Sequence, residues 1–402
     1  MLTLFILLEN RGDIRIMLTI LKRPFIVLLL FFSLFFIYGL ADAKVTGLCV
    51  NCHTMHNSQN GTVMAGYGGS GQGPNESLTR GDCMGCHGMG PTKIVNVGGS
   101  NFPQVFHSDS SDLAGGNFKY IQTYGNNRGH NVKELGIQDP LLNTGIPGAF
   151  KGSFHNVIID NSTKLLTCAG SRGCHGKRLA GTDISGLQTL KGAHHKSVAG
   201  VKDTASDVYN SYRYLMGVKG YESSNWQNTD SANHNEYFGA NTPLLYYSTC
   251  TNACHASGQT GQPVIAPQNT MSGFCATCHG NFHSLSGSGA GTYGLTSGIG
   301  PTSPPSSPSS TPFIRHPTDV VIPIGGEYSA YTSYSVEAPV ARQTVYSAPS
   351  GVVNPGSDVV MCLSCHMSHA SKYPSMLRWD YTQMVAGGGG SGGCFTCHTQ
   401  KN

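Results

Sequence analysis

The chain has 402 residues, a formal net charge of +4 and only 11% charged residues, whereas 53 of its residues are glycine. So small a net charge excludes the strongly basic surface of a typical nucleic-acid-binding protein. A chain this rich in glycine loses much conformational entropy on folding and has few side chains to bury in return. We therefore expect it to fold around a bound group in addition to an apolar core.

Residues 1–43 have the pattern of a secretory signal peptide. A basic pair at 22–23 precedes an apolar run at 25–40, and Ala-Asp-Ala at 41–43 is a small-x-small cleavage motif. The alternative is a membrane anchor, but the run is shorter than the roughly 20 apolar residues that span a bilayer. We expect an exported mature chain that starts at Lys44 and has no transmembrane segment.

The cysteines form a repeated motif along the rest of the chain. There are 14 of them in seven close pairs, and the second cysteine of each pair is followed directly by histidine. In chain order the motifs are Cys49-x-x-Cys52-His53, Cys83-x-x-Cys86-His87, Cys168-(five residues)-Cys174-His175, Cys250-(three residues)-Cys254-His255, Cys275-x-x-Cys278-His279, Cys362-x-x-Cys365-His366 and Cys394-x-x-Cys397-His398. Five motifs have the two-residue spacing, and the two at 168–175 and 250–255 are stretched.

Three chemistries could use such pairs. Disulfides place no demand on the residue after a cysteine, and tetrahedral zinc sites do not require a histidine fused to every pair. Covalent haem explains each part, because two thiols add to the vinyl groups and the next residue binds the iron. The sequence therefore predicts seven haem c groups, with the seven cysteine-linked histidines as proximal ligands. For the stretched motifs, a disulfide or a singly attached haem is the alternative.

The remaining histidines are candidates for the second axial position of each iron. Eight are predicted distal ligands, and two more complete the set: His56, His130, His194, His195, His234, His283, His316 and His369, together with His107 and His155. His194 and His195 are adjacent, so either or both can serve. Methionine is the other common second ligand, but ten histidines exceed the seven needed and favour two histidines at every iron.

Three of these histidines follow a proximal histidine by three or four residues. They are His56, His369 and His283. At helical spacing each lies one turn along on the same side as its neighbour, so it cannot reach the other face of the same haem. It can bind the iron of an adjacent haem instead, which predicts haems packed in close pairs.

Glycine- and serine-rich stretches separate the motifs. We expect an N-terminal haem-binding region at 44–285 with five haem sites, a Gly/Ser/Pro-rich linker at 286–312 and a C-terminal haem-binding region at 313–402 with two. One short helix is expected within 207–219. The predicted fold is mostly irregular coil with short α-helices and little β structure, wrapped around a closely stacked chain of covalent haems.

The two ends of the chain carry equivalent units. Cys-His-Thr-Met-His-Asn-Ser at 52–58 matches Cys-His-Met-Ser-His-Ala-Ser at 365–371. These segments, with Arg-Gly-His-Asn-Val at 128–132 and Cys-His-Gly-Asn-Phe-His at 278–283, resemble the doubled-CxxCH multihaem c-type cytochromes. That group includes the filament-forming extracellular (nanowire) cytochromes of metal-reducing bacteria. The resemblance implies a continuous stack of haems in which two histidines bind each iron. It also implies that His56 reaches a neighbouring copy of the chain and binds the iron held there by His366.

The function favoured by these features is electron transfer rather than catalysis. We expect partners that are further copies of the chain, joined head to tail, and redox partner cytochromes or extracellular acceptors, with no nucleic acid. The expected location is extracellular or on the outer cell surface, with the periplasm as the alternative. One alternative function is a multihaem oxidoreductase that reduces a nitrogen or sulfur oxyanion, and another is a monomeric periplasmic electron relay.

Overall fold

A computed structural model describes most of the chain after the N-terminal segment. The described residues are 45–65, 74–88, 90–136, 139–140, 146, 159, 164–178, 186–226, 228–241, 269–279, 316 and 318–401. The chain divides into two units, Met1–Ala43 and Lys44–Asn402, and every described residue belongs to the second. Several predictions fall outside the described residues: the signal peptide, the linker at 286–312, the motif at 250–255, His155 and His283.

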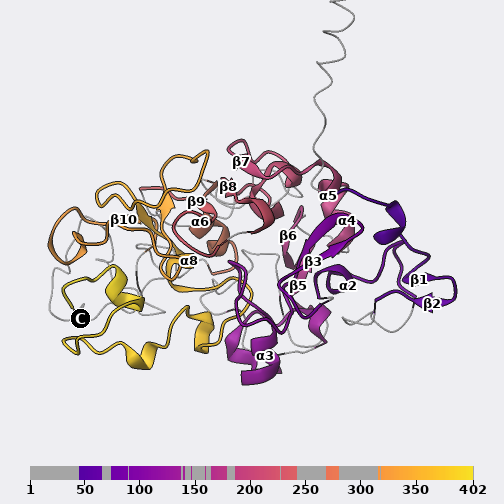
Figure 1. The fold of residues 1–402 in the computed structure, drawn as a ribbon, viewed down its shortest axis with the longest axis horizontal. Helices are drawn as coiled ribbons and strands as arrows, with labels where there is room; N and C mark the ends of the chain where they lie inside the picture. Colours follow the sequence, from indigo (N-terminus) through magenta and orange to yellow (C-terminus); the bar gives the residue numbers. More distant parts are fainter. Residues whose placement is uncertain are drawn as a thin grey trace, which may run out of the picture. The chain divides into compact units, whose positions relative to one another are not determined.

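The helices are short and irregular (Figure 1). The α-helices are α2 (Cys83–His87), α3 (Lys119–Tyr124), α4 (Gly186–Leu190), α5 (Ala193–Lys196), α6 (Met271–Ala276) and α8 (Cys362–Cys365). The 3₁₀ turns are η1 (Cys49–Asn51), η2 (Asn126–Arg128), η3 (Lys133–Leu135), η5 (Val208–Asn210), η6 (Tyr212–Tyr214), η7 (Ser224–Trp226), η11 (Gly326–Tyr328), η12 (Pro374–Met376), η13 (Tyr381–Gln383) and η14 (Gly393–Thr396). Within the described ranges, none of the helices has the length and apolar character needed to cross a bilayer.

The single helix expected within 207–219 is wrong. Two 3₁₀ turns, η5 and η6, occupy this segment instead. Arg213 and Tyr214 adopt left-handed backbone angles, with φ of 48° and 61°, which no α-helix tolerates. The backbone N–H of Arg213 donates to Glu222 Oε1 at 2.6 Å, so a tertiary hydrogen bond replaces the helical one.

Six strands of two or three residues form one sheet. We expected little β structure, and the sequence did not predict this sheet. Its order is β10-β12-β11-β9-β8-β7, and β11 pairs with β9 in parallel while the other pairs are antiparallel. The strands are β7 (Gly200–Lys202), β8 (Gly220–Glu222), β9 (Glu236–Phe238), β10 (Val320–Val321), β11 (Ala341–Arg342) and β12 (Val359–Val360). The sheet therefore joins segments from both sides of the predicted linker.

Three two-stranded sheets complete the β structure of the described chain. They pair β1 (Ser58–Gln59) with β2 (Thr62–Val63), β3 (Ile94–Val97) with β4 (Ser100–Pro103), and β5 (Thr167–Ala169) with β6 (Gly173–His175). The first two pairs are antiparallel and the third is parallel.

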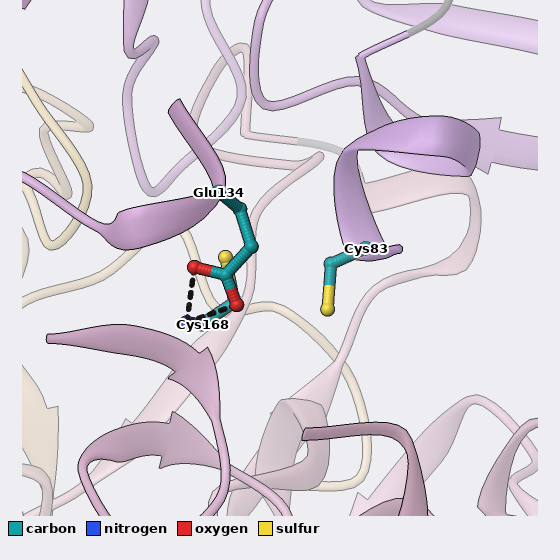
Figure 2. A group of neighbouring side chains, drawn as sticks. All are labelled: Cys83, Glu134 and Cys168. Carbon is teal, nitrogen blue, oxygen red and sulfur yellow. Dashed lines mark hydrogen bonds between the residues drawn. The ribbon is translucent and has the colours of Figure 1, made fainter. Parts of the chain in front are cut away.

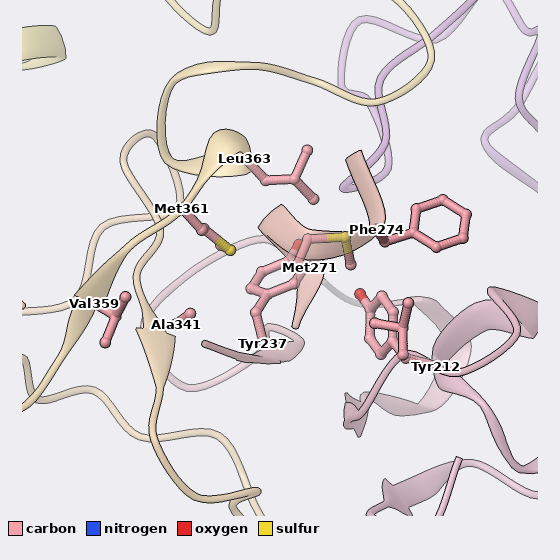
Figure 3. Packing of buried hydrophobic residues seen from close by; sticks show 9 residues of the cluster. Tyr212, Tyr237, Met271, Phe274, Ala341, Val359, Met361 and Leu363 are labelled. Carbon is pink, nitrogen blue, oxygen red and sulfur yellow. The ribbon is translucent and has the colours of Figure 1, made fainter. Parts of the chain in front are cut away.

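Most of the larger buried apolar side chains in the described ranges belong to three small clusters, and each cluster packs against a motif cysteine. The first cluster, drawn in Figure 3, contacts Cys174 and is made of Tyr212, Val218, Tyr237, Met271, Phe274, Ala341, Val359, Met361 and Leu363. The second contacts Cys168 and is made of Met84, Phe118, Ile121, Val132, Leu135 and Ala370. The third contacts Cys397 and is made of Ile322, Tyr331, Tyr334, Val340 and Val353. The apolar core is thus divided and surrounds the motif cysteines.

An ionic network lies at the centre of the six-stranded sheet. Arg342 on β11 forms ion pairs with Glu236 on β9, at 2.9 Å, and with Asp358, and each of the three side chains is about 1% exposed. Glu236 also accepts hydrogen bonds from Ser350 N, at 2.6 Å, and from the ring of His234. The network ties β9 and β11 together by side chains as well as by their parallel backbone pairing.

Replacing Arg342 with methionine should lower the stability of the folded chain by about 3–5 kcal/mol, because two carboxylates then lie buried without their cation. Thermal unfolding of the haem-loaded protein measures the effect, with the exposed Lys372→Met variant as the matched control. An Arg342→Met variant as stable as the control would show that the network contributes nothing.

Candidate haem-binding sites

In most motifs a single helical turn brings the two cysteines and the histidine together. The backbone N–H of His53, His279, His366 and His398 each donates to the carbonyl of the first cysteine of its own motif, at 2.8–3.1 Å. Asp82 and Thr270 cap α2 and α6 by accepting backbone N–H groups with their side chains. Local hydrogen bonds thus bring the cysteines and the histidine of each of these motifs together.

The stretched motif at 168–175 has a different structure. Its two cysteines lie on β5 and β6, which pair in parallel with Thr167 opposite Gly173 and Ala169 opposite His175. This register puts Cys168 beside Cys174 on the neighbouring strand. Of the five intervening residues, Ala169 and Gly173 belong to the strands, and only residues 170–172 form the connection. The extra length of the motif therefore does not separate the two cysteines.

Five proximal histidines face a second histidine from elsewhere in the chain. The ring centroids are 6.1–6.3 Å apart in the pairs His53–His195, His87–His194, His175–His369, His279–His130 and His398–His316. Two imidazole nitrogens that bind one ion from opposite sides at about 2 Å place the ring centres roughly 6 Å apart. The spacing fits an iron held between each pair.

Hydrogen bonds at Nδ1 orient these rings. The Nδ1–H donates to a backbone carbonyl in six histidines: His53 to Leu78 at 3.3 Å, His56 to Asn75, His87 to Pro103, His130 to Ser368 and His366 to Ser375 at 2.8 Å, and His175 to Arg213 at 2.9 Å. A carbonyl can only accept, so each ring carries its proton on Nδ1 and leaves the Nε2 lone pair for a metal. The Nδ1 of His398 instead lies 3.3 Å from the Glu327 carboxylate.

Burial keeps several of these rings neutral. It lowers the pKa of His87, His130, His175 and His366, and it lowers the pKa of His369 to about 3, with the nearby His175 adding to the effect. A metal-binding imidazole must be neutral, so the environment prepares these rings for that role at neutral pH.

A close backbone contact positions His130 and His369. The N–H of His130 donates to the His369 carbonyl at 2.9 Å, and the N–H of His369 donates to Gly115 at 2.7 Å. A Cβ on Gly129 would lie 2.5 Å from both the His369 carbonyl oxygen and the Ala370 side chain. The Arg-Gly-His segment at 128–130 thus needs its glycine for this contact, which joins two regions distant in sequence.

Four of the predicted ligands do not form such pairs. Neither His56 nor His366 has a histidine ring partner in the described part of the chain. His234 is fully buried, stacks on Tyr334 at 3.7 Å, and has its two ring nitrogens 3.2 Å from the Asp230 carbonyl and 3.0 Å from Glu236. The Nε2 of buried His107 lies 3.1 Å from the Asn117 side-chain nitrogen.

Successive motifs meet through their cysteines. First cysteines meet at Cys83–Cys168 and at Cys275–Cys362, where the thiols are within hydrogen-bond reach of each other. Second cysteines interact electrostatically at Cys52–Cys86, Cys174–Cys278 and Cys365–Cys397. These five junctions connect the described motifs in one row, in the order of their histidines at 53, 87, 175, 279, 366 and 398.

Sequence reasoning identified the ligand candidates but missed the groups that orient them. Backbone carbonyls such as those of Pro103 and Ser375 occur at every residue, so no residue type marks the ones that bind a histidine. Glu327 stands far from His398 in the sequence and belongs to no motif. Only the tertiary contacts reveal these partners.

Comparison with known proteins gives two kinds of similarity. The family model named doubled CXXCH motif matches residues 354–402. C-type cytochrome OmcS of Geobacter sulfurreducens is 25% identical over 381 residues, which cover 83% of this chain and 78% of that protein.

Two solved structures from the same organism also match. The Outer Membrane Cytochrome S Filament has a TM-score of 0.37 and 18% identity, over 84% of this chain and 85% of that one. The OmcS nanowires, studied by cryo-EM, have a TM-score of 0.36 and 18% identity, over 83% and 84%. The predicted resemblance to the doubled-CXXCH multihaem c-type cytochromes is therefore confirmed by the family match at 354–402 and by the similarity to C-type cytochrome OmcS.

Proposed function

We propose that this protein is a heptahaem c-type cytochrome that carries electrons along a row of haems, each iron held between two histidines. The observation that carries the proposal is the set of five histidine pairs with centroids 6.1–6.3 Å apart. When bound, haem c supplies a one-electron iron couple. An iron with two protein ligands has no open position for a substrate, so it transfers electrons without substrate chemistry.

The chain's own residues hold and insulate the haems in this proposal. The motif cysteines attach them, the proximal and paired histidines bind the irons, and the Nδ1 hydrogen bonds fix the rings. We assign His234 and His107 to structure instead. Both groups near the His234 ring are hydrogen-bond acceptors, and the Asn117 amide occupies the His107 Nε2 lone pair. For the motif at 250–255, the candidates remain those predicted from the sequence.

We propose further that copies of the chain join head to tail into an extracellular filament, with His56 binding the iron held by His366 of the next copy. Three observations support this. The His56 ring is exposed, its Nδ1 donates to Asn75 like the paired histidines, and His366 has no histidine partner in the described chain. Exposed apolar side chains surround this part of the chain: Leu48, Met55 and Leu78 are 72%, 67% and 53% exposed. A second copy that covers them would gain by their burial.

The lack of a histidine partner for His366 in the described part of the chain also favours one rival function. In a monomer, an iron with a single protein ligand could bind a small oxyanion, as a multihaem reductase requires. The two functions differ in whether this position stays open in the native assembly.

Carbon monoxide binding to the reduced native protein tests the proposal, combined with the ferric spin state and electron microscopy. We expect polymers, an entirely low-spin ferric spectrum and no carbon monoxide adduct. A monomer with one high-spin iron that binds carbon monoxide would support the reductase instead. Compact monomers with only low-spin irons would support a monomeric relay and overturn the filament.

Single histidine substitutions test the ligand assignments. The His195→Ala variant should convert one iron, that of the His53 motif, to a high-spin form that binds carbon monoxide, because its partner ring is gone. The His234→Ala variant is the control and should keep every iron low-spin, since we assign this ring to the Glu236 network. High-spin iron in the His234→Ala variant would reverse that assignment.

A further inference from the structure

Charged side chains lie at the junctions where the cysteines of successive motifs meet. The clearest is Arg178, which is 2% exposed and sits at the junction of Cys174 and Cys278. One terminal nitrogen of its guanidinium lies 4.0 Å from the Cys278 sulfur, and the other donates to Thr277 at 2.9 Å. The guanidinium also lies over the Phe274 ring, 4.6 Å from its centre.

The other two junctions of second cysteines also have an arginine. Arg80 acts electrostatically on Cys52 and Cys86, and its backbone N–H donates to the Cys52 carbonyl at 3.1 Å. Arg378 acts on Cys365 and repeats this contact, with its N–H donating to the Cys365 carbonyl at 2.9 Å. The echo between the two ends of the chain thus extends from the motifs to the arginines beside them.

The two junctions of first cysteines have a carboxylate instead. Figure 2 shows Glu134 beside Cys168, with Cys83 close to both. The two Glu134 oxygens lie 3.1 and 3.2 Å from the Cys168 backbone nitrogen. Glu134 is 9% exposed, and Asp82 adds a second negative charge nearby. At the junction of Cys275 and Cys362, the fully buried Asp319 acts on the Cys362 thiol.

The five junctions therefore alternate along the row between a cationic and an acidic side chain. Burial raises the pKa of Glu134 and raises that of Asp319 to about 7, so both carboxyls carry a full negative charge only at alkaline pH. In order they carry Arg80, Glu134, Arg178, Asp319 and Arg378. Among the described motifs, each interior one has an arginine at one cysteine and a carboxyl group at the other. The last motif has Arg378 at its junction and a carboxylate, Glu327, on its histidine ring.

The three arginines at the junctions lack a carboxylate partner among the described residues. In the part of the chain that the structure describes, Arg178, Arg378 and Arg80 form no ion pair with an acidic side chain, and each has a buried guanidinium nitrogen without a hydrogen-bond partner. Burial lowers the pKa of Arg378, which reflects the cost of this placement. Such charges are expensive to bury, so their repetition at equivalent junctions points to a role at the haems rather than in packing.

The geometry points to these junction charges as the residues that level the reduction potentials along the row, an inference that rests on the proposed electron-transfer function. An electron that enters the row adds one unit of negative charge beside the junction. A cation there stabilises that charge and raises the potential of both neighbouring haems, whereas an anion lowers it. With one of each at an interior motif, the two effects oppose each other. Neighbouring haems then keep similar potentials, as conduction in either direction requires.

The motif at 168–175 offers the sharpest test, because Arg178 and Glu134 flank it from opposite sides. In a spectroelectrochemical titration at alkaline pH, where Glu134 is ionised, Arg178→Gln should shift two haems, those of His175 and His279, to lower potential. Glu134→Gln should shift those of His87 and His175 to higher potential. In the double variant the two shifts should cancel at His175 and remain at His87 and His279.

The controls remove equivalent charges elsewhere. Lys372→Gln and Glu76→Gln alter exposed residues and should leave the titration unchanged. Arg178→Lys keeps the charge and should keep the potentials if the variant attaches all haems. Mass spectrometry counts the haems and the low-spin spectrum reports their ligands in each variant.

The outcome separates this inference from the proposed function. Unshifted potentials in Arg178→Gln and Glu134→Gln, with haem number and spin state intact, would overturn the role of the junction charges and leave electron transfer standing. High-spin irons in the native protein would count against the function itself. If the Arg178→Gln variant attaches fewer haems, the test rests on the reduction potentials of the Glu134→Gln variant. Potentials that fall or stay unchanged in that variant would overturn the inference.

Discussion

Substituting alanine for His56 should abolish polymerisation while leaving haem attachment unchanged. His56 is exposed, and its Nδ1–H donates to the Asn75 carbonyl at 2.8 Å, which leaves the Nε2 lone pair for the proposed bond to the iron of another copy. Without it, the iron held by His366 loses its second ligand. We expect monomers in electron microscopy, one high-spin ferric haem, and one equivalent of carbon monoxide bound after reduction.

Added imidazole separates the two effects of this substitution. Free imidazole should fill the open position in the His56→Ala variant and restore the low-spin spectrum, but it cannot restore the polymer because it links nothing. The Gln59→Ala variant, altered at a nearby position, should behave as the native protein. Polymers of normal length formed by His56→Ala would refute the proposed crossing ligand.

The second large effect is expected from the chain without haem. Protein made under conditions that prevent haem attachment should not fold into this structure. In the described part of the chain, the hydrophobic clusters are three and small, and each is built against a cysteine that would carry haem. Arg178 and Arg378 are 2% and 8% exposed and lack an ion-pair partner in the described chain. Each such charge costs several kcal/mol, against a total stability of about 5–15 kcal/mol for a typical domain.

Limited proteolysis and circular dichroism of the haem-free chain measure this effect. We expect rapid cleavage across the sheet strands and no cooperative thermal transition, whereas the haem-loaded protein should resist cleavage there. Protection of β9 and β11 in the haem-free chain would show that the six-stranded sheet is stable by its own contacts, with the Arg342 network sufficient to hold it.

The sequence by itself determined the chemistry of the sites. Haem attachment needs two thiols and a histidine that lie close together in the chain. Each site is therefore visible in the sequence as a complete local motif. The same holds for the single helical turns of these motifs, which hydrogen bonds between the histidine and the first cysteine close. The surplus of histidines also pointed to two nitrogen ligands at each iron, because a count requires no knowledge of the fold.

The tertiary structure decided which of these groups meet. His53 and His195, or His398 and His316, are brought together by contacts between segments far apart in the chain, and no periodicity encodes such contacts. Strands of two to four residues are too short to show an alternating pattern, so the six-stranded sheet was not predicted. His234 has the same residue type as the paired histidines, and our proposal that it is structural rests on its position beside Glu236. The local chemistry of each motif could therefore be predicted from the sequence. Long-range packing decided which histidines pair, because burial and backbone hydrogen bonds place some histidine rings opposite each other and others elsewhere.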